Sequence, residues 1–264
     1  MTLELVATGL VLVLAAPDLW HALRLSGWAR WRTVVYLASC ALLWWCLAGT
    51  PALLRSAQGS WGVVGVALAD VLVGFGFVVA APVRLWEEAR GRRVAWIRSR
   101  AIQVLGFPLV SATLNGVLIV VAFTSSWFVR ARSDDSSWIA LILACVLGGL
   151  FANLQLLSPD VVPGWMTPGL RMALSLVDGL LDELPGIVVM VTVNPVWGGI
   201  LWGVVQPVVV PMMILIIIDW MRHDRKVAHE VDSALDSIES AGGTTSTPWW
   251  ITESRGDESG SGEP

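Results

Sequence analysis

Long apolar runs, separated by short polar segments, make up most of the chain as far as Trp220. Each run has about the 20 residues that a helix needs to cross the hydrocarbon core of a bilayer. The seven runs are 3–23, 33–54, 61–83, 102–124, 137–157, 170–193 and 196–220. The pattern therefore predicts an all-α, polytopic membrane protein with seven transmembrane helices.

Basic residues are concentrated in alternate loops. With seven spans, the first, third and fifth loops lie on the same side as the C-terminal tail, and these segments hold 14 of the 17 Lys and Arg residues. Only Arg55, Arg130 and Arg132 fall on the other side. Because basic loops stay in the cytoplasm, we expect the N-terminus outside and the C-terminus in the cytoplasm, in a multi-pass protein of a bacterial plasma membrane.

The chain turns polar after the last apolar run. We expect a transmembrane domain over 1–220, a cytoplasmic amphipathic helix over 221–239 and a disordered acidic tail over 240–264. One apolar stripe on the amphipathic helix consists of Val227, Val231, Ala234 and Ile238. Such a helix extends the last span, lies on the membrane surface or docks on a partner. The tail is rich in Gly, Ser, Thr and acidic residues, which is typical of disorder.

The composition excludes several classes of protein. Hydrophobic residues make up 55% of the chain and charged residues only 14%, whereas soluble domains have about 25% charged residues. The chain therefore has too few charges to cover a water-exposed surface, and a lipid bilayer is its expected surrounding. A net charge of −4 also argues against a nucleic-acid partner, which needs a basic face.

Polar side chains at the depth of the hydrocarbon core are the candidates for a functional site, because they are costly there. Asp178 and Asp182 are four residues apart in the sixth run and share one helix face. Two close carboxylates resist double ionisation, so the pair could bind a cation or share a proton. Pairing with Arg or with backbone donors is the structural alternative. The full candidate set is Asp70, Asp178, Asp182, Glu183, Asn115 and Asn153.

Residues for metal binding and catalysis are scarce. Copper sites with soft ligands need Cys, Met or His close together, but Cys40 and Cys46 are six residues apart and lie on different helix faces. Met212 lies in a very apolar run and is expected to face lipid. No Ser-His-Asp set and no Gly-rich phosphate loop can be identified. We therefore predict no metal site, no cofactor and no enzyme activity.

Short motifs along the chain are a second source of functional information. Pro82 ends a Val-Ala-Ala-Pro sequence in the third run, and Gly198 and Trp202 form Gly-x-x-x-Trp in the seventh. Residues at four-residue spacing follow: Trp220, Asp224, Ala228 and Asp232. Together with seven spans and an outside N-terminus, these motifs resemble the CtaG family of cytochrome c oxidase assembly factors.

The resemblance covers about residues 10–235 and implies a role in biogenesis of the respiratory chain, with heme–copper oxidase subunits as partners. CtaG proteins are implicated in supplying copper to these oxidases. The family carries H-x-x-x-H about ten residues before the proline that matches Pro82, but Ala67–Gly74 contains no His. The family's other histidines fall near Phe123 and Leu141, where His is also missing. The copper that the family suggests is therefore not expected here.

Three hypotheses follow. The first is a divergent CtaG-like protein that aids oxidase assembly as a scaffold or auxiliary factor. The second is a small proton- or cation-handling transporter that uses Asp70, Asp178 and Asp182, and the third is a membrane anchor whose cytoplasmic helix recruits a partner. The missing histidines favour the first and third over copper delivery, and the intramembrane acids favour the second. We rank the first highest.

Overall fold

The structure is a computed structural model that describes residues 3–25, 27–49, 53, 59–91, 94–157, 162–163 and 165–240. These residues form helices and loops without a strand, so the expected all-α class is confirmed for them. They divide into two compact units, of which the first ends at Ile217 and the second begins at Ile218. Of the tail expected over 240–264, all but Ser240 lies outside the described residues.

A proline explains one of the helix boundaries in the first half of the chain. Its elements are α1 (Leu3–Arg24), α2 (Arg30–Trp44), η1 (Trp45–Gly49), α4 (Ser60–Leu68), η2 (Ala69–Val73), α5 (Gly74–Ala80) and α6 (Pro82–Arg90). The π-helical turn η1 continues α2, and the π-helical turn η2 joins α4 to α5. Ala81 has a left-handed φ of 51°. Because a proline disfavours the α conformation in the residue before it, the helix ends there and α6 begins at Pro82.

The second half of the chain departs from expectation at one span. Its elements are η3 (Ala95–Arg98), α7 (Arg100–Leu105), α8 (Pro108–Thr124), α9 (Trp127–Ala131), α10 (Asp135–Leu157), α11 (Pro168–Thr192) and α12 (Pro195–Ser240). The prediction of one helix over 102–124 was wrong, because α7 and α8 are separate. Phe107 is extended, with ψ of 124°, as the following Pro108 requires.

Five segments are long and apolar enough to cross a membrane: Leu3–Arg24, Arg30–Gly49, Ser60–Arg90, Asp135–Leu157 and Pro195–Ser237. Two of the seven expected spans fall short of these criteria. Helix α8 is apolar but has only 17 residues, and α11 contains four ionisable residues. Length and composition thus identify a membrane protein with five candidate spans.

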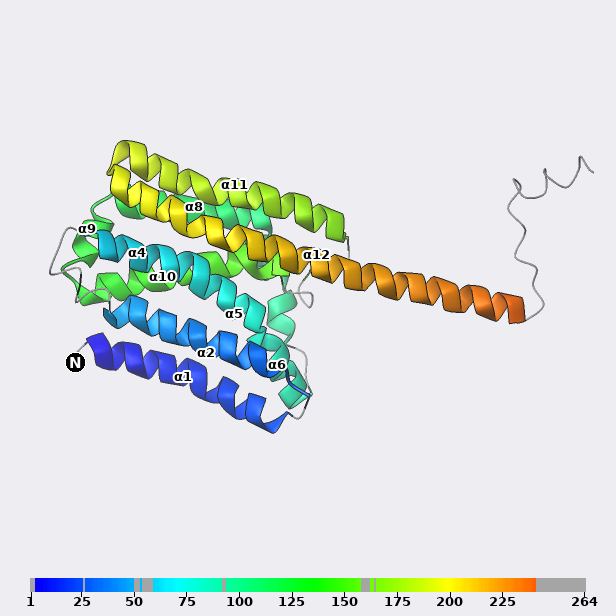
Figure 1. The fold of residues 1–264 in the computed structure, drawn as a ribbon. Coiled ribbons are helices and arrows are strands. Elements are labelled where there is room, and N and C mark those ends of the chain that lie inside the picture. Colours follow the sequence, from blue (N-terminus) through cyan, green and yellow to red (C-terminus); the bar gives the residue numbers. More distant parts are fainter. Residues whose placement is uncertain are drawn as a thin grey trace, which may run out of the picture. The chain divides into compact units, whose positions relative to one another are not determined.

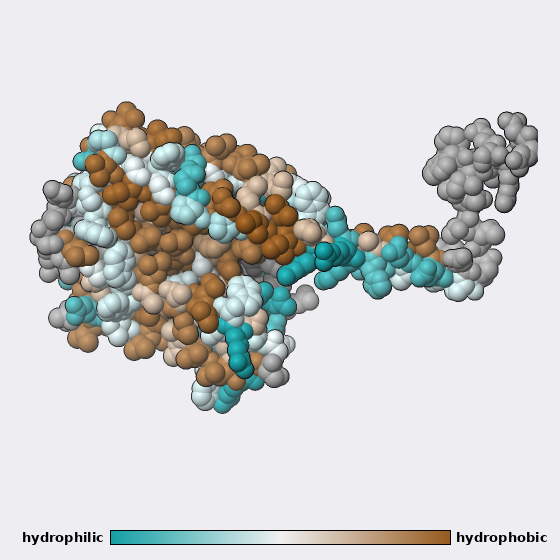
Figure 2. Space-filling view, viewed as in Figure 1, coloured by the Kyte–Doolittle hydropathy of each residue, from teal (hydrophilic) through white to brown (hydrophobic). Residues whose placement is uncertain are grey.

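The helices of the first unit lie side by side in one bundle (Figure 1). Helix α1 packs on α2, α2 on α5, α5 and η2 on α10, α10 on α8, and α8 on α11. Two buried side chains donate to backbone carbonyl groups inside the bundle: Trp138 Nε1 donates to the Cys46 carbonyl oxygen at 3.0 Å, and the Tyr36 hydroxyl donates to the Leu14 carbonyl oxygen at 3.1 Å. Hydrophobic residues cover most of the visible face of this unit (Figure 2). An apolar exterior, with hydrogen bonds formed inside the bundle, suits a lipid bilayer.

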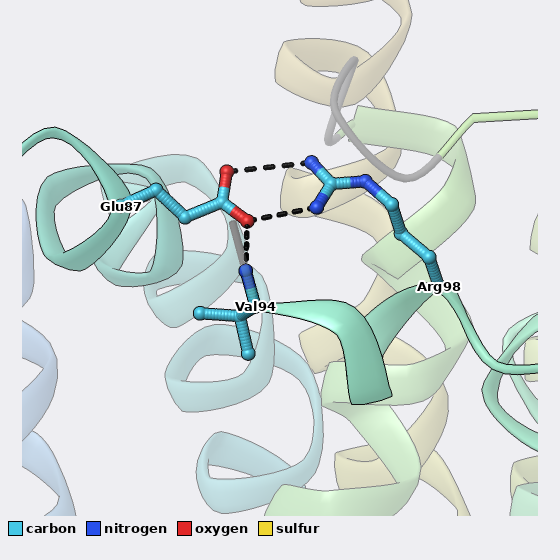
Figure 3. A network of polar contacts seen from close by, with 3 residues as sticks. All are labelled: Glu87, Val94 and Arg98. Carbon is cyan, nitrogen blue, oxygen red and sulfur yellow. Dashed lines mark hydrogen bonds and ion pairs between the residues drawn. The ribbon is translucent and has the colours of Figure 1, made fainter. Parts of the chain in front are cut away.

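An ion pair joins α6 to η3. Glu87 Oε1 and Oε2 accept hydrogen bonds from Arg98 Nη1 at 2.8 Å and Nη2 at 3.3 Å (Figure 3). Glu87 Oε1 also accepts from the backbone N–H of Val94 at 2.7 Å. Bidentate pairs of this kind are both strong and directional, so Glu87 holds η3 against the end of α6.

Candidate functional site

Polar side chains from four helical segments meet at two small adjacent cavities inside the bundle. Both cavities are lined by Asp70 of η2, Asn115 of α8 and Asp182 of α11. One of them is also lined by Asp178 of α11 and Asn153 of α10. Each cavity has a volume of about 20 Å³, which is enough for one water molecule. The structure thus brings five of the six candidate polar residues together.

The position of Asp70 depends on the π turn. Asp70 lies in η2, in the middle of a segment that is otherwise α-helical, and such turns are frequent at functional sites. Asp70 Oδ1 accepts a hydrogen bond from Asn115 Nδ2 at 2.9 Å. The Asp70 carbonyl oxygen lies where a Cβ atom at Gly149 would be. Only glycine at this position lets α10 approach η2 so closely.

Asp178 is the most deeply buried acid of the cluster. Its side chain is 2% exposed, and Oδ1 has no hydrogen-bond partner among the described residues. Asn115 Oδ1 is also buried and without a partner in the described part of the chain. Within the described ranges, no Lys, Arg or His lines either cavity. Ionising a carboxyl group at the centre of a bilayer costs at least about 2.5 kcal/mol. The described lining of the cavities provides no positive charge that would offset this cost.

Comparison with known proteins now places the chain in a family. A family model described as cytochrome c oxidase caa3 assembly factor (Caa3_CtaG) matches residues 13–223. The chain belongs to this family. The match runs from α1 into α12 and includes every residue that lines the two cavities. Comparisons with curated proteins and with solved structures give no match. The resemblance drawn from the short motifs is therefore confirmed.

One wall of the cavities in this Caa3_CtaG chain comes from a residue that sequence reasoning misplaced. Met212 was expected to face lipid, but its side chain is only 4% exposed and lines a cavity. Val205, Val208 and Met212 follow at spacings of three and four residues, so they share one face of α12. That face is turned toward the acids of α11. The spacing was visible in the sequence, but the run is apolar on all sides and does not identify its inner face.

Glu183 is the one candidate polar residue that the structure keeps out of the cavities. It follows Asp182 directly, and consecutive helical residues point in directions about 100° apart. Its Oε1 accepts a hydrogen bond from Gln206 Nε2 on α12. Asn153 remains at the cavity, where its Nδ2 donates to the Gly149 carbonyl oxygen at 2.8 Å.

The family-motif residues of the first unit, Pro82, Gly198 and Trp202, do not line the cavities. Pro82 begins α6, as described above. Gly198 lies against the backbone of α11 at Gly186 and Met190, whereas the side chain of Trp202 is exposed. The remaining motif residues are exposed and lie on the helix of the second unit: Trp220, Asp224 and Asp232.

The residues present do not fit a copper ion. In the described ranges, no group of three or more His, Cys, Asp or Glu side chains could hold a metal ion. Cys40, Cys46 and Cys145 are buried, but the soft ligands that copper needs are not gathered at one place. The absence of copper from the purified protein stays a prediction.

Proposed function

We propose that this chain aids the assembly of cytochrome c oxidase as a membrane-embedded scaffold or auxiliary factor. The observation that carries the proposal is the family match over residues 13–223. Five membrane-capable segments support it further, because oxidase subunits are themselves membrane proteins. The partners that we propose are heme–copper oxidase subunits in a bacterial plasma membrane.

A scaffold role without a standard copper site is favoured over copper delivery. The stretch Ala67–Gly74 contains none of the family's histidines, and the described residues lack a metal-binding group. The comparisons give no support to the hypothesis of a small transporter. We propose neither enzyme activity nor a resident cofactor.

We propose seven spans, with α8 and α11 crossing the membrane beside the five longer segments. Helix α8 is apolar throughout, and a 17-residue helix is at the short end of the range for a span. Helix α11 turns Asp178 and Asp182 toward the cavities, while its outer face exposes Leu180, Leu184 and Ile187. An apolar outer face suits contact with lipid.

The proposed orientation has the N-terminus outside and the C-terminus in the cytoplasm, as the basic residues indicate. A reporter protein fused after residue 240 tests it. A reporter that is active only in the cytoplasm should be active at this position, and one that is active only outside should be inactive. The reverse result would contradict the seven-span topology.

Removal of the gene from its native host tests the function. We expect less assembled cytochrome c oxidase, measured by heme spectra of membranes and by native gels, with recovery when the full chain is supplied in trans. A respiratory dehydrogenase in the same membranes is the control and should keep its activity. Normal oxidase levels in the deletion strain would contradict an assembly role. Recovery by added copper alone would contradict the scaffold and indicate copper supply.

A further inference from the structure

We propose that Asp70, Asp178 and Asp182 form a buried proton-binding site, in which the carboxyl groups share at least one proton through enclosed water. The inference rests on the two cavities and not on the assembly role, and either proposal can fail without the other.

Among the described residues, the ionisable groups that line the cavities are all acids. Segment η2 contributes Asp70 and α11 contributes Asp178 and Asp182, whereas the residues that α8, α10 and α12 contribute to the lining are uncharged. A further titratable group near Asp70 is the buried thiol of Cys145 on α10. Arg171 lies seven residues before Asp178 and donates to the Leu156 carbonyl oxygen instead. Three ionised carboxylates would therefore repel one another in a medium that solvates them poorly.

The groups around the cavities include too few hydrogen-bond donors for the acceptors present. The amide groups of Asn115 and Asn153 donate to Asp70 Oδ1 and to the Gly149 carbonyl oxygen. Among the described residues that line the cavities, the buried polar atoms without a partner are two acceptors, Asn115 Oδ1 and Asp178 Oδ1, and both residues line the same cavity. A proton on a carboxylate converts one acceptor into a donor. Together with one water molecule, it supplies the hydrogens that these oxygens need.

A proton fits this site better than a metal cation does. Hard cations such as Ca²⁺ need six to eight oxygen ligands, but the described residues contain no group of three acidic, His or Cys side chains that could hold a metal ion. A cavity of about 20 Å³ has room for one water molecule, and not for a cation with its own hydration shell. The acids are therefore neutralised by protons.

Infrared spectroscopy of the full chain in lipid at neutral pH tests the proposal. A protonated carboxyl group has a carbonyl stretching band apart from the carboxylate bands, and the band shifts in D₂O. We expect the unmodified chain to show such a band. The variants Asp70→Asn, Asp178→Asn and Asp182→Asn should lose the area of at least one carboxyl group or shift the band, because each alters the shared network.

Asp18→Asn is the matched control. Asp18 on α1 is 3% exposed with an unpartnered Oδ1 among the described residues, but it lines neither cavity. This variant should remove at most the contribution of Asp18 and leave the band of the cluster unchanged. If one Asn variant does not fold, the unmodified chain and the other two variants still decide the matter.

Three results would overturn the proposal. The first is the absence of a protonated carboxyl band at neutral pH. The second is a band that disappears in Asp18→Asn and stays unchanged in the three cluster variants. The third is loss of the band at constant pH when Na⁺ or Ca²⁺ is added, which would identify a metal cation as the ligand.

Discussion

Two neighbouring glycines on α12 allow a sharp test of how α11 and α12 pack. A Cβ atom at Gly198 would overlap the backbone nitrogen of Met190 and the backbone oxygen of Gly186, both on α11. A Cβ atom at Gly199 would meet nothing within 4 Å. The variants Gly198→Ala and Gly199→Ala thus add the same methyl group to the same helix, one position apart. Any difference between them reports the contact with α11.

The size of the difference follows from two opposing effects. Replacing Gly by Ala within a helix stabilises it by up to about 1 kcal/mol, and Gly199→Ala should show this gain alone. At Gly198 the obstacle is backbone, which cannot rotate away as a side chain can, so the two helices must move apart. Overpacking of this kind costs up to about 3 kcal/mol. We expect Gly198→Ala to lose about 2 kcal/mol net and to differ from Gly199→Ala by about 3 kcal/mol.

Reversible denaturant unfolding in detergent micelles, followed by the fluorescence of the 16 Trp residues, measures both variants. Gly186→Ala provides an intermediate case, because its Cβ would lie 2.8 Å from the backbone nitrogen of Trp202. Its stability should fall between the other two. Equal stability of Gly198→Ala and Gly199→Ala would refute the close approach of α11 and α12.

Three further predictions concern other parts of the chain. Glu87→Gln removes the ion pair with Arg98 and should lower the free energy of unfolding by about 0.2–1 kcal/mol, with a smaller loss at high salt. Thermal unfolding at two salt concentrations measures this loss. A loss that does not depend on salt would contradict the prediction. Hydrogen bonds from Ser137 and Ser136 lower the pKa of Asp134 from 3.8 to about 2. A lowered pKa stabilises the fold above pH 3.8, and this stabilisation is lost as the pH falls through 2. The melting temperature of the unmodified chain should therefore be higher than that of Asp134→Ala at pH 7, but not below pH 2. Elemental analysis of the purified protein should find no stoichiometric copper, and about one copper per chain would contradict the prediction.

The sequence was sufficient for the helical class and for most of the polar cluster. Apolar runs specify membrane helices because the bilayer excludes unpaired backbone groups. The four-residue spacing of Asp178 and Asp182 predicted a shared face. The break before Pro108 was also foreseeable, since a proline restricts the residue before it. These features depend on local chemistry, which the sequence displays directly.

Other features of the site depend on packing between helices and were not predictable. The π turn around Asp70 has no marker of its own in the sequence, and its approach to Gly149 becomes apparent only when α10 is in place. Met212 lies in a run that is apolar on every side, so its inward position follows from the neighbours of α12 and not from its own pattern. Glu183 is the opposite case: it follows Asp182 in the sequence and was expected in the polar cluster, but its side chain points away from the cavities.

The π turn η2 has a consequence for comparing this chain with its relatives. A π turn contains one residue more than the α-helical turn that it replaces, and each residue of an α-helix advances the direction of the side chain by about 100°. A relative with a regular α-helix here would have one residue fewer in this segment. Its alignment with this chain would therefore need a one-residue gap within Ala69–Val73. The family's H-x-x-x-H motif lies about ten residues before Pro82, in the stretch that contains this turn. Because Ala67–Gly74 contains no His at any position, shifting the alignment by one residue does not restore the missing ligands.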